Sequence, residues 1–322
     1  MKRDAYAQAA AQKRQRRLRE LLYALTRSVV LAGLSFVLLY PILYIFSMAF
    51  RPSSEVLDPL VVWIPRTFTL ENIRSAFSGM KYLESLWQSI RISLVSSLIS
   101  VAVYSLVGYG FARFQFRLKK PLFAVLIFTI ILPPQAILIP QYLDNSFFDF
   151  FLIGRLIGLF TGTPLTVNLL DSVWAFYLPA LFGAGVRSGI LIFIFIQFYR
   201  GLPKELEDAA YIDGCGPLRT FTRIMLPNST PALITVLLFS VVWYWNDSQY
   251  AGMFLVVNQT LPLRLANLQT VLNSAAGQPL DPYQLSVLMP AGCLLFILLP
   301  LIFYIVFQRY FTESIERTGL VG

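Results

Sequence analysis

Residues 200–227 read RGLPKELEDAAYIDGCGPLRTFTRIMLP. Within them, residues 203–213 are mostly good helix formers, and a proline followed by acidic residues suits a first helical turn. Gly214 and Gly216 interrupt this pattern, and Pro217 can open a second helix. The stretch therefore predicts a helix, a turn and a second helix.

Long apolar runs lie on both sides of this stretch. A transmembrane helix needs about 20 mostly apolar residues, and the sequence contains six such runs. Their approximate bounds are 28–50, 90–111, 121–142, 173–199, 229–250 and 285–307. The chain has 57% hydrophobic and 13% charged residues, whereas a soluble domain has about 25% charged residues. The sequence thus predicts an all-α, polytopic membrane protein with six transmembrane helices.

The positive charges predict how this protein is oriented. Eighteen of the 26 Lys and Arg residues fall on the inner side when the N-terminus is placed inside. Cytoplasmic segments carry such an excess of positive charge, so both termini and residues 200–227 are predicted to be cytoplasmic. The basic segment 1–27 favours contact with membrane lipid over nucleic acid, because no aromatic platform for bases accompanies its charges.

The composition also excludes several kinds of chemistry. The sequence has no histidine and two cysteines, Cys215 and Cys293. Ser-His-Asp catalysis, two-histidine zinc sites and histidine-ligated haem are therefore excluded. One cysteine falls in the cytoplasmic loop and the other in the sixth span, so no disulfide is expected. We predict no catalytic residue and no metal site.

The loop between the fourth and fifth spans carries a specific motif. Asp208-Ala209-Ala210, a gap of three residues, Gly214, a gap of nine and Ile224-Met225-Leu226-Pro227 follow the spacing E-A-A-x3-G-x9-I-x-L-P. This pattern resembles the EAA motif of ABC importer permeases, with Asp208 in the place of Glu. The likeness to the carbohydrate branch, the maltose-transporter G-type family, covers about residues 28–310. It also includes Tyr109-Gly110-Phe111-Ala112-Arg113, Trp245-Asn246 and Leu261-Pro262-Leu263.

This resemblance implies a function and a set of partners. The chain would be a permease subunit of an ATP-driven, binding-protein-dependent importer of sugars or oligosaccharides in a bacterial or archaeal cytoplasmic membrane, and not an enzyme. It would pair with a second related permease, two ATP-binding subunits and an extracytoplasmic solute-binding protein. ATP and Mg would be bound by the ATP-binding subunits, since this sequence has no G-x-x-x-x-G-K-[ST] run.

The charge pattern, the apolar spans and the resemblance together divide the chain into parts. Residues 1–27 are a basic cytoplasmic segment, residues 28–310 the permease domain and residues 311–322 a cytoplasmic tail. The permease domain includes the EAA coupling loop, residues 200–227, and an outer insertion, residues 143–172.

The resemblance further implies that the coupling loop contacts the ATPase. The residues expected there are Glu207, Asp208, Ala209, Ala210 and Gly214. Small alanines permit close approach and a glycine permits the turn. An exposed ion pair contributes only about 0.2–1 kcal/mol, so shape and apolar burial should dominate. Leu202, Leu206, Leu218 and Phe221 are expected to form an apolar side of this loop.

The fifth span holds candidate substrate contacts. Trp243, Asn246, Asp247 and Tyr250 are spaced i, i+3, i+4 and i+7, so a continuous helix would place them on one face. Ionisable groups inside a membrane rarely face lipid, and a face of aromatic, amide and carboxylate groups suits a sugar. The alternatives are packing against the partner permease and aromatic anchoring at the outer interface.

Two further patterns have two readings each. The second span carries a stripe of serines, which predicts either tight helix packing or a lining of the translocation path. These are Ser89, Ser93, Ser96, Ser97 and Ser100. In the outer insertion, Gly154, Gly158 and Gly162 are four residues apart, which fits either close helix approach or simple flexibility.

Two other functions have weaker support in the sequence. A secondary transporter coupled to protons generally needs intramembrane carboxylates or histidine, and the spans offer Asp247 alone. A membrane glycosyltransferase would need a converging acidic or metal-binding cluster in a loop. The acidic residues of the inner loop are already explained by the EAA spacing.

Overall fold

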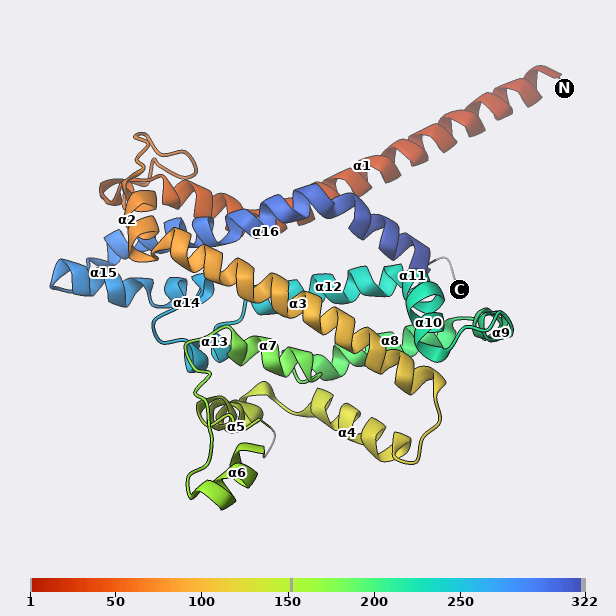
Figure 1. Cartoon of the computed structure of the whole chain (residues 1–322). Helices are drawn as coiled ribbons and strands as arrows, with labels where there is room; N and C mark the ends of the chain where they lie inside the picture. Colours follow the sequence, from red (N-terminus) through yellow and green to blue (C-terminus); the bar gives the residue numbers. More distant parts are fainter. Residues whose placement is uncertain (1, 151–152, 320–322) are drawn as a thin grey trace. The chain divides into compact units, whose positions relative to one another are not determined.

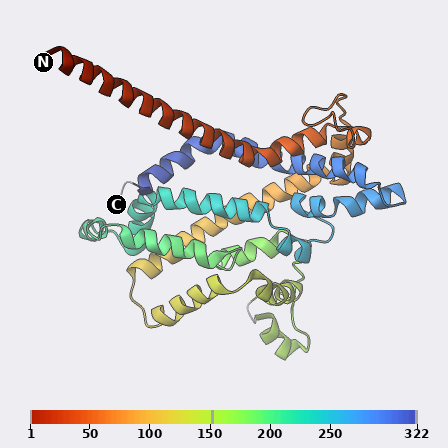
Figure 2. The same ribbon diagram turned by 180° about the vertical axis from the view of Figure 1, so that it is seen from behind.

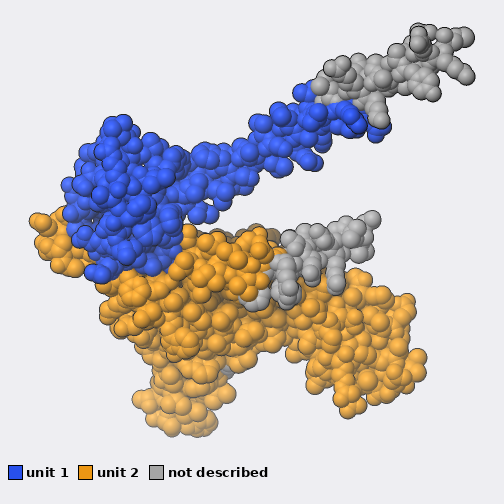
Figure 3. Space-filling view, turned by 90° about the horizontal axis from the view of Figure 1, so that it is seen from above, with its two compact units in different colours: residues 1–76, 280–295 blue, residues 77–279, 296–322 orange. Residues whose placement is uncertain are grey.

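The structure is a computed structural model that describes residues 2–150 and 153–319. Throughout these residues it is helical, apart from connections and an isolated antiparallel bridge between Phe148 and Val167, so the all-α prediction is confirmed there. The chain divides into two compact units (Figure 3). One unit contains residues 1–76 and 280–295, and the other contains residues 77–279 and 296–322.

The first unit is built on one long helix. Helix α1 (Lys2–Ala49) has no break between the predicted basic segment and the first span. The connection after it contains η1 (Ser53–Glu55) and leads to α2 (Glu71–Gly79). Arg51 folds this connection onto the end of α1, because its guanidinium donates hydrogen bonds of 3.0 Å to the Ser47 hydroxyl and to the Val62 carbonyl.

The second unit is centred on α3 (Tyr82–Arg113). This helix packs against α7 (Trp174–Leu181), α8 (Ser188–Gly201) and α12 (Thr230–Trp245) (Figures 1 and 2). Its buried residues include Ser85, Ser89, Ser93, Ser96, Ser97, Ser100 and Ser105. The stripe predicted from the sequence thus lies inside the helix packing of this unit, where small side chains allow helices to approach closely.

The third predicted span is broken into two helices. Helix α4 (Lys119–Ile131) and helix α5 (Pro134–Ser146) are bent by 107° relative to each other. Pro133 and Pro134 cause the break, because a residue that precedes proline is pushed from helical to extended backbone. The apolar run 121–142 is therefore not one continuous helix, although α4 and α5 together still qualify as one bent span.

The fourth predicted span is also discontinuous. Helix α7 ends at Leu181 and α8 begins at Ser188. Between them Gly183 and Arg187 have positive φ angles of 75° and 52°, a conformation that does not continue a right-handed helix. The expectation of one helix over 173–199 is wrong for this reason.

The glycines of the outer insertion bring the chain close to itself. Helix α6 (Ile153–Thr161) is followed by a segment that runs back along it. A Cβ atom at Gly154 would lie 1.9 Å from the Leu165 carbonyl oxygen, and one at Gly158 would lie 2.7 Å from Pro164 Cα. These glycines therefore make room for their own returning chain and do not pair α6 with another helix.

The remaining elements complete the second half of the chain. The loop between α8 and α12 contains α9 (Glu205–Ile212), α10 (Pro217–Thr220), the π-helix η2 (Phe221–Met225) and α11 (Leu226–Asn228). After α12 come α13 (Gln249–Phe254), α14 (Leu261–Ala266), α15 (Leu268–Ala276) and α16 (Pro282–Gly319). Helix α16 passes residue 311 without a break, and residues 320–322 of the predicted tail lie outside the described residues.

Three helices within the described residues are long and apolar enough to cross a membrane. Their apolar parts are Arg19–Ala49, Tyr82–Arg113 and Pro282–Val306. Two bent pairs also qualify when each is counted as one span: α4 with α5, and residues 217–228 with α12. The broken helices explain why fewer continuous spans are present than the six that the sequence predicts.

Candidate coupling loop and substrate path

The loop between α8 and α12 has the predicted helix, turn and helix. Helix α9 ends in a Schellman motif: the Cys215 amide donates to the Ala210 carbonyl, and the Gly214 amide donates to the Tyr211 carbonyl. Gly214 has a φ of 78°, which is the left-handed conformation that this motif requires. The glycine of the EAA spacing is therefore the residue that ends α9. In Figures 1 and 2, α9 lies at the same end of the second unit as α10.

The five predicted coupling residues divide between two faces of this loop. Asp208, Ala209 and Gly214 are exposed, whereas Glu207 and Ala210 are buried with exposed fractions of 7% and 2%. The structure thus brings the five together in one short element but turns two of them toward the rest of the chain.

The apolar side of the loop differs from the expected one. Phe221 is buried, and Leu202 and Leu206 are half-buried, whereas Leu218 is 68% exposed. Ile212, which sequence reasoning missed, is 86% exposed. A signal was available, since Ile212 lies two residues before the glycine that ends α9, where a side chain has few neighbours.

Two contacts attach the loop to α3. The Arg113 Nε atom lies 3.1 Å from a carboxylate oxygen of Glu207, and the guanidinium also donates a hydrogen bond of 2.7 Å to the Leu202 carbonyl. Farther along the loop, the Phe221 ring lies 5.1 Å from the Tyr109 ring between centroids. Arg113 thus contacts the start of α9, whereas Tyr109 contacts η2 through Phe221 and also lies near Glu207 and Tyr211 of α9.

The four predicted substrate residues do not share a helix face. Helix α12 ends at Trp245, and α13 begins at Gln249. The Asp247 carboxylate accepts hydrogen bonds from the backbone amides of Tyr250 and Ala251, at 3.1 and 3.0 Å. The prediction of a common face is therefore wrong, because Asp247 stabilises the first turn of a new helix.

The other members of this set also have local partners. The exposed Asn246 side chain donates a hydrogen bond of 2.8 Å to the Val242 carbonyl. The Arg187 guanidinium lies over the Trp243 ring at 5.0 Å from its centroid, an attractive cation–π contact.

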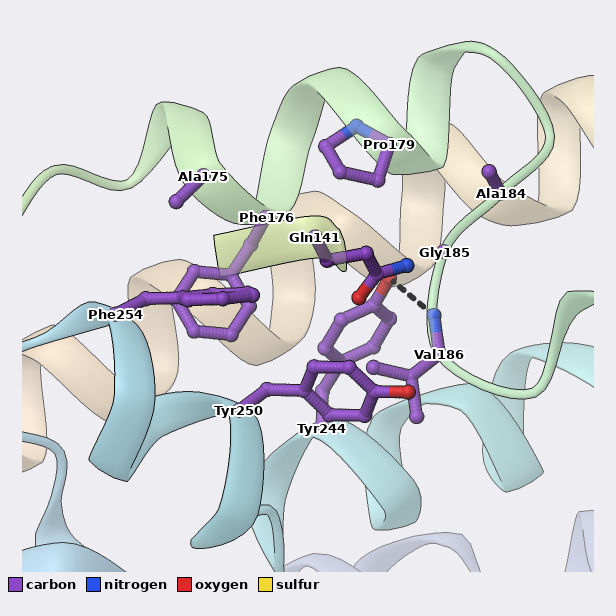
Figure 4. A pocket seen from close by; sticks show the side chains of 10 residues that line it. All are labelled: Gln141, Ala175, Phe176, Pro179, Ala184, Gly185, Val186, Tyr244, Tyr250 and Phe254. Carbon is purple, nitrogen blue, oxygen red and sulfur yellow. Dashed lines mark hydrogen bonds between the residues drawn. The ribbon is translucent and has the colours of Figure 1, made fainter. Parts of the chain in front are cut away.

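Tyr250 alone of the four lines a cavity, which Figure 4 shows from close by. Its walls are mostly apolar and aromatic, and the Val186 amide donates a hydrogen bond of 3.2 Å to the Tyr244 hydroxyl at one side. The lining residues are Gln141, Ala175, Phe176, Pro179, Ala184, Gly185, Val186, Tyr244, Tyr250 and Phe254. The space inside is only about 20 Å³, enough for about one water molecule and far less than the roughly 300–1,000 Å³ of a small-molecule site. Gln141 was not predicted, because it comes from α5, far away in the sequence.

Comparison with known proteins identifies the family. The profile of the family described as "Binding-protein-dependent transport system inner membrane component" matches residues 104–317. The chain belongs to this family. It is therefore a permease subunit of an ABC importer and an inner-membrane protein, not an enzyme, and ATP is hydrolysed by a partner subunit. The EAA motif is typical of the family, and neither the secondary transporter nor the glycosyltransferase is favoured.

Several curated relatives are similar over most of their length. The arabinooligosaccharides transport system permease protein AraQ of Halalkalibacterium halodurans is 29% identical over 90% of this chain and 94% of its own. The trehalose transport system permease protein SugB of Mycobacterium tuberculosis is 28% identical over 88% of this chain and 93% of its own. A third, the polygalacturonan/rhamnogalacturonan permease protein YtcP of Bacillus subtilis, is 29% identical over 74% of each chain.

A solved structure has the same fold. It is the crystal structure of a bacterial ABC transporter involved in the import of the acidic polysaccharide alginate. The match has a TM-score of 0.66 and 20% sequence identity, and it covers 90% of this chain and 96% of that one.

Proposed function

We propose that this chain forms half of the translocation path of a carbohydrate importer and is coupled to ATP hydrolysis through α9. The carbohydrates in the names of the three relatives support the substrate class. The assembled transporter would contain a second related permease, two ATP-binding subunits and an extracytoplasmic solute-binding protein. ATP and Mg would be bound by the ATP-binding subunits, and both termini of this chain would lie in the cytoplasm.

The exposed face of the coupling loop is the observation that carries this proposal. Asp208, Ala209 and Gly214 lie in the open together with Ile212 and Leu218. Burying a side chain such as isoleucine contributes about 1.5–3 kcal/mol, whereas an exposed ion pair made by Asp208 contributes about 0.2–1 kcal/mol. Apolar burial against the ATPase would therefore supply most of the binding energy, and the carboxylate would set the register.

The two buried members of the predicted set have a different part in this proposal. Glu207 and Ala210 face the rest of the chain, so they would support α9 from behind without touching the ATPase.

Ile212→Glu tests the proposed ATPase contact. The variant places a charge in the centre of the exposed face, so we expect it to reduce the amount of ATPase that co-purifies and to abolish uptake. Leu118→Glu is the matched control, because Leu118 is 62% exposed in the preceding inner connection. Normal co-purification with Ile212→Glu, or an equal loss with Leu118→Glu, would contradict the assignment of this face.

Tyr250 is our candidate for a substrate contact, because it alone of the four predicted residues lines the cavity, which would have to widen to admit a sugar. Tyr250→Phe keeps the ring that lines the cavity and removes the hydroxyl. The loss of one hydrogen bond to a sugar, about 0.5–1.5 kcal/mol, corresponds to an apparent KM raised about 2- to 12-fold. Uptake of a panel of labelled oligosaccharides, with the binding protein present, measures this change. Asn246→Ala serves as the comparison, and an unchanged KM with Tyr250→Phe assigns Tyr250 to packing only. Failure to take up any carbohydrate would contradict the substrate class.

A further inference from the structure

Arg113 and Glu207 form a buried ion pair between the inner end of α3 and the start of the coupling loop. Their side chains are only 7% and 9% exposed, and the closest nitrogen–oxygen distance is 3.1 Å. Arg113 is the last residue of α3, and Glu207 lies in the first turn of α9. The pair therefore joins two elements that are 94 residues apart in the sequence.

This pair is a charged side-chain attachment of α9 to α3, next to the Tyr109 hydroxyl of α3, which also lies near Glu207. Within α9, Glu207 and Ala210 are the buried residues, and an alanine methyl group contributes little compared with a charged contact. The same guanidinium holds the Leu202 carbonyl at 2.7 Å. Arg113 thus contacts the loop at two positions: Leu202, just before α9, and Glu207, in the first turn of α9.

The position of α3 means that this attachment links α9 to the centre of the second unit. The helix packs against α7, α8 and α12, so a displacement of its inner end reaches the centre of the second unit. Separation of the pair would leave two buried charges without their partners, which is strongly unfavourable. The pair is therefore expected to stay closed while α9 moves.

We propose that Arg113 is the positioning residue that transmits movement of α9 to α3, through its ion pair with Glu207 and its hydrogen bond to Leu202. This inference rests on the proposed contact between α9 and the ATPase. Force applied to the exposed face of α9 would pass through Glu207 to Arg113 and then along α3. Tyr109 contacts Phe221 in η2 and its hydroxyl lies near Glu207 and Tyr211 of α9, but it offers no charge to pair with the Glu207 carboxylate.

The test uses the complete transporter, reconstituted in vesicles with its ATPase, partner permease and binding protein. Both ATP hydrolysis and sugar uptake are measured for Arg113→Gln. We expect at least half of the basal ATP hydrolysis to remain and the uptake per ATP hydrolysed to fall at least tenfold. Arg117→Gln is the matched control, since Arg117 is exposed four residues later, and its ratio of uptake to hydrolysis should not change.

Two further variants separate transmission from simple stability. Arg113→Lys retains the charge but not the fork that reaches both partners, so it should recover part of the coupling. The exchange Arg113→Glu with Glu207→Arg should recover more coupling than either single change. If Arg113→Gln does not assemble, the ratio of uptake to hydrolysis in Arg113→Lys decides in its place.

Two results would overturn the inference. One is an unchanged ratio of uptake to ATP hydrolysis in Arg113→Gln or, where that variant does not assemble, in Arg113→Lys. The other is an equal fall of assembly, hydrolysis and uptake in Arg113→Lys, which would make the pair purely structural. Failure of the proposed contact between α9 and the ATPase would give a different result. In that case Ile212→Glu would leave ATPase binding intact, whatever the behaviour of Arg113.

Discussion

At the scale of single residues, the coupling loop depends on the backbone angle of Gly214. A left-handed conformation costs an ordinary L-residue about 1–2 kcal/mol, and no neighbouring atom lies within 4 Å of a Cβ atom built at this position. The requirement for glycine is therefore conformational and not steric.

Gly214→Ser should consequently weaken coupling without a clash. A cost of about 1–2 kcal/mol lowers the population of the native turn about 5- to 30-fold relative to open forms, so co-purified ATPase and uptake should both fall while membrane insertion is retained. Gly216→Ser is the control, because Gly216 has an ordinary φ of −75° and caps α10, where serine is favourable. Equal activity of the two variants would contradict this explanation.

Asp247 shows that the type of a residue alone can lead to a wrong prediction of its role. A carboxylate in an apolar span predicts a functional contact, but its oxygens bind the amides that begin α13. The sequence contained a hint, since Asn246, Asp247 and Ser248 together are typical of the start of a helix. The spacing of residues in the predicted span 229–250 indicates one helix that continues through these three residues.

At the scale of elements, proline and glycine decide where helices break and how closely they pack. Pro133 and Pro134 separate α4 from α5, and the left-handed residues after α7 separate it from α8. In α3, Gly108 faces α8: a Cβ atom there would lie 2.4 Å from the Phe195 Cβ atom and 3.2 Å from the Ile196 backbone nitrogen.

Gly108→Ala should therefore force α3 and α8 apart. Overpacking of this kind costs about 1–3 kcal/mol, and we expect a lower midpoint in thermal unfolding of the detergent-solubilised protein. Gly110→Ala lies two residues away in the same helix and has no neighbour within 4 Å, so its midpoint should be unchanged or raised, since alanine favours helix. Equal destabilisation by both substitutions would show that the close approach of α3 and α8 is not the cause.

At the scale of the whole molecule, the net charge of +9 is distributed with a clear bias. Eighteen of the 26 basic residues fall in the segments predicted to be cytoplasmic. This bias predicts that the coupling loop lies on the inner side and the connection after α1 on the outer side.

Labelling of single cysteines tests this orientation. Ile212 is 86% exposed and Leu60 is 78% exposed, so a cysteine at either position is open to reagents. In a chain that lacks Cys215 and Cys293 and is produced without its ATPase, a membrane-impermeant maleimide should label Ile212→Cys in inverted vesicles and Leu60→Cys in intact spheroplasts. Reaction of both variants from the same side would refute the predicted topology.

The sequence by itself determined the family, the apolar spans and the location of the coupling loop. Each of these depends on short-range patterns: runs of apolar residues, the spacing from Asp208 to Pro227, and the glycine that must end α9. Such patterns lie within about twenty consecutive residues, so neighbours distant in the sequence do not change them.

Only the tertiary structure decided which side of each element is buried. Glu207 and Asp208 are adjacent acidic residues, yet Arg113 draws one inward and leaves the other exposed. The cavity likewise joins Gln141 of α5 to Tyr250 of α13. Burial and pairing depend on elements brought together from distant parts of the chain, and no local spacing contains that information.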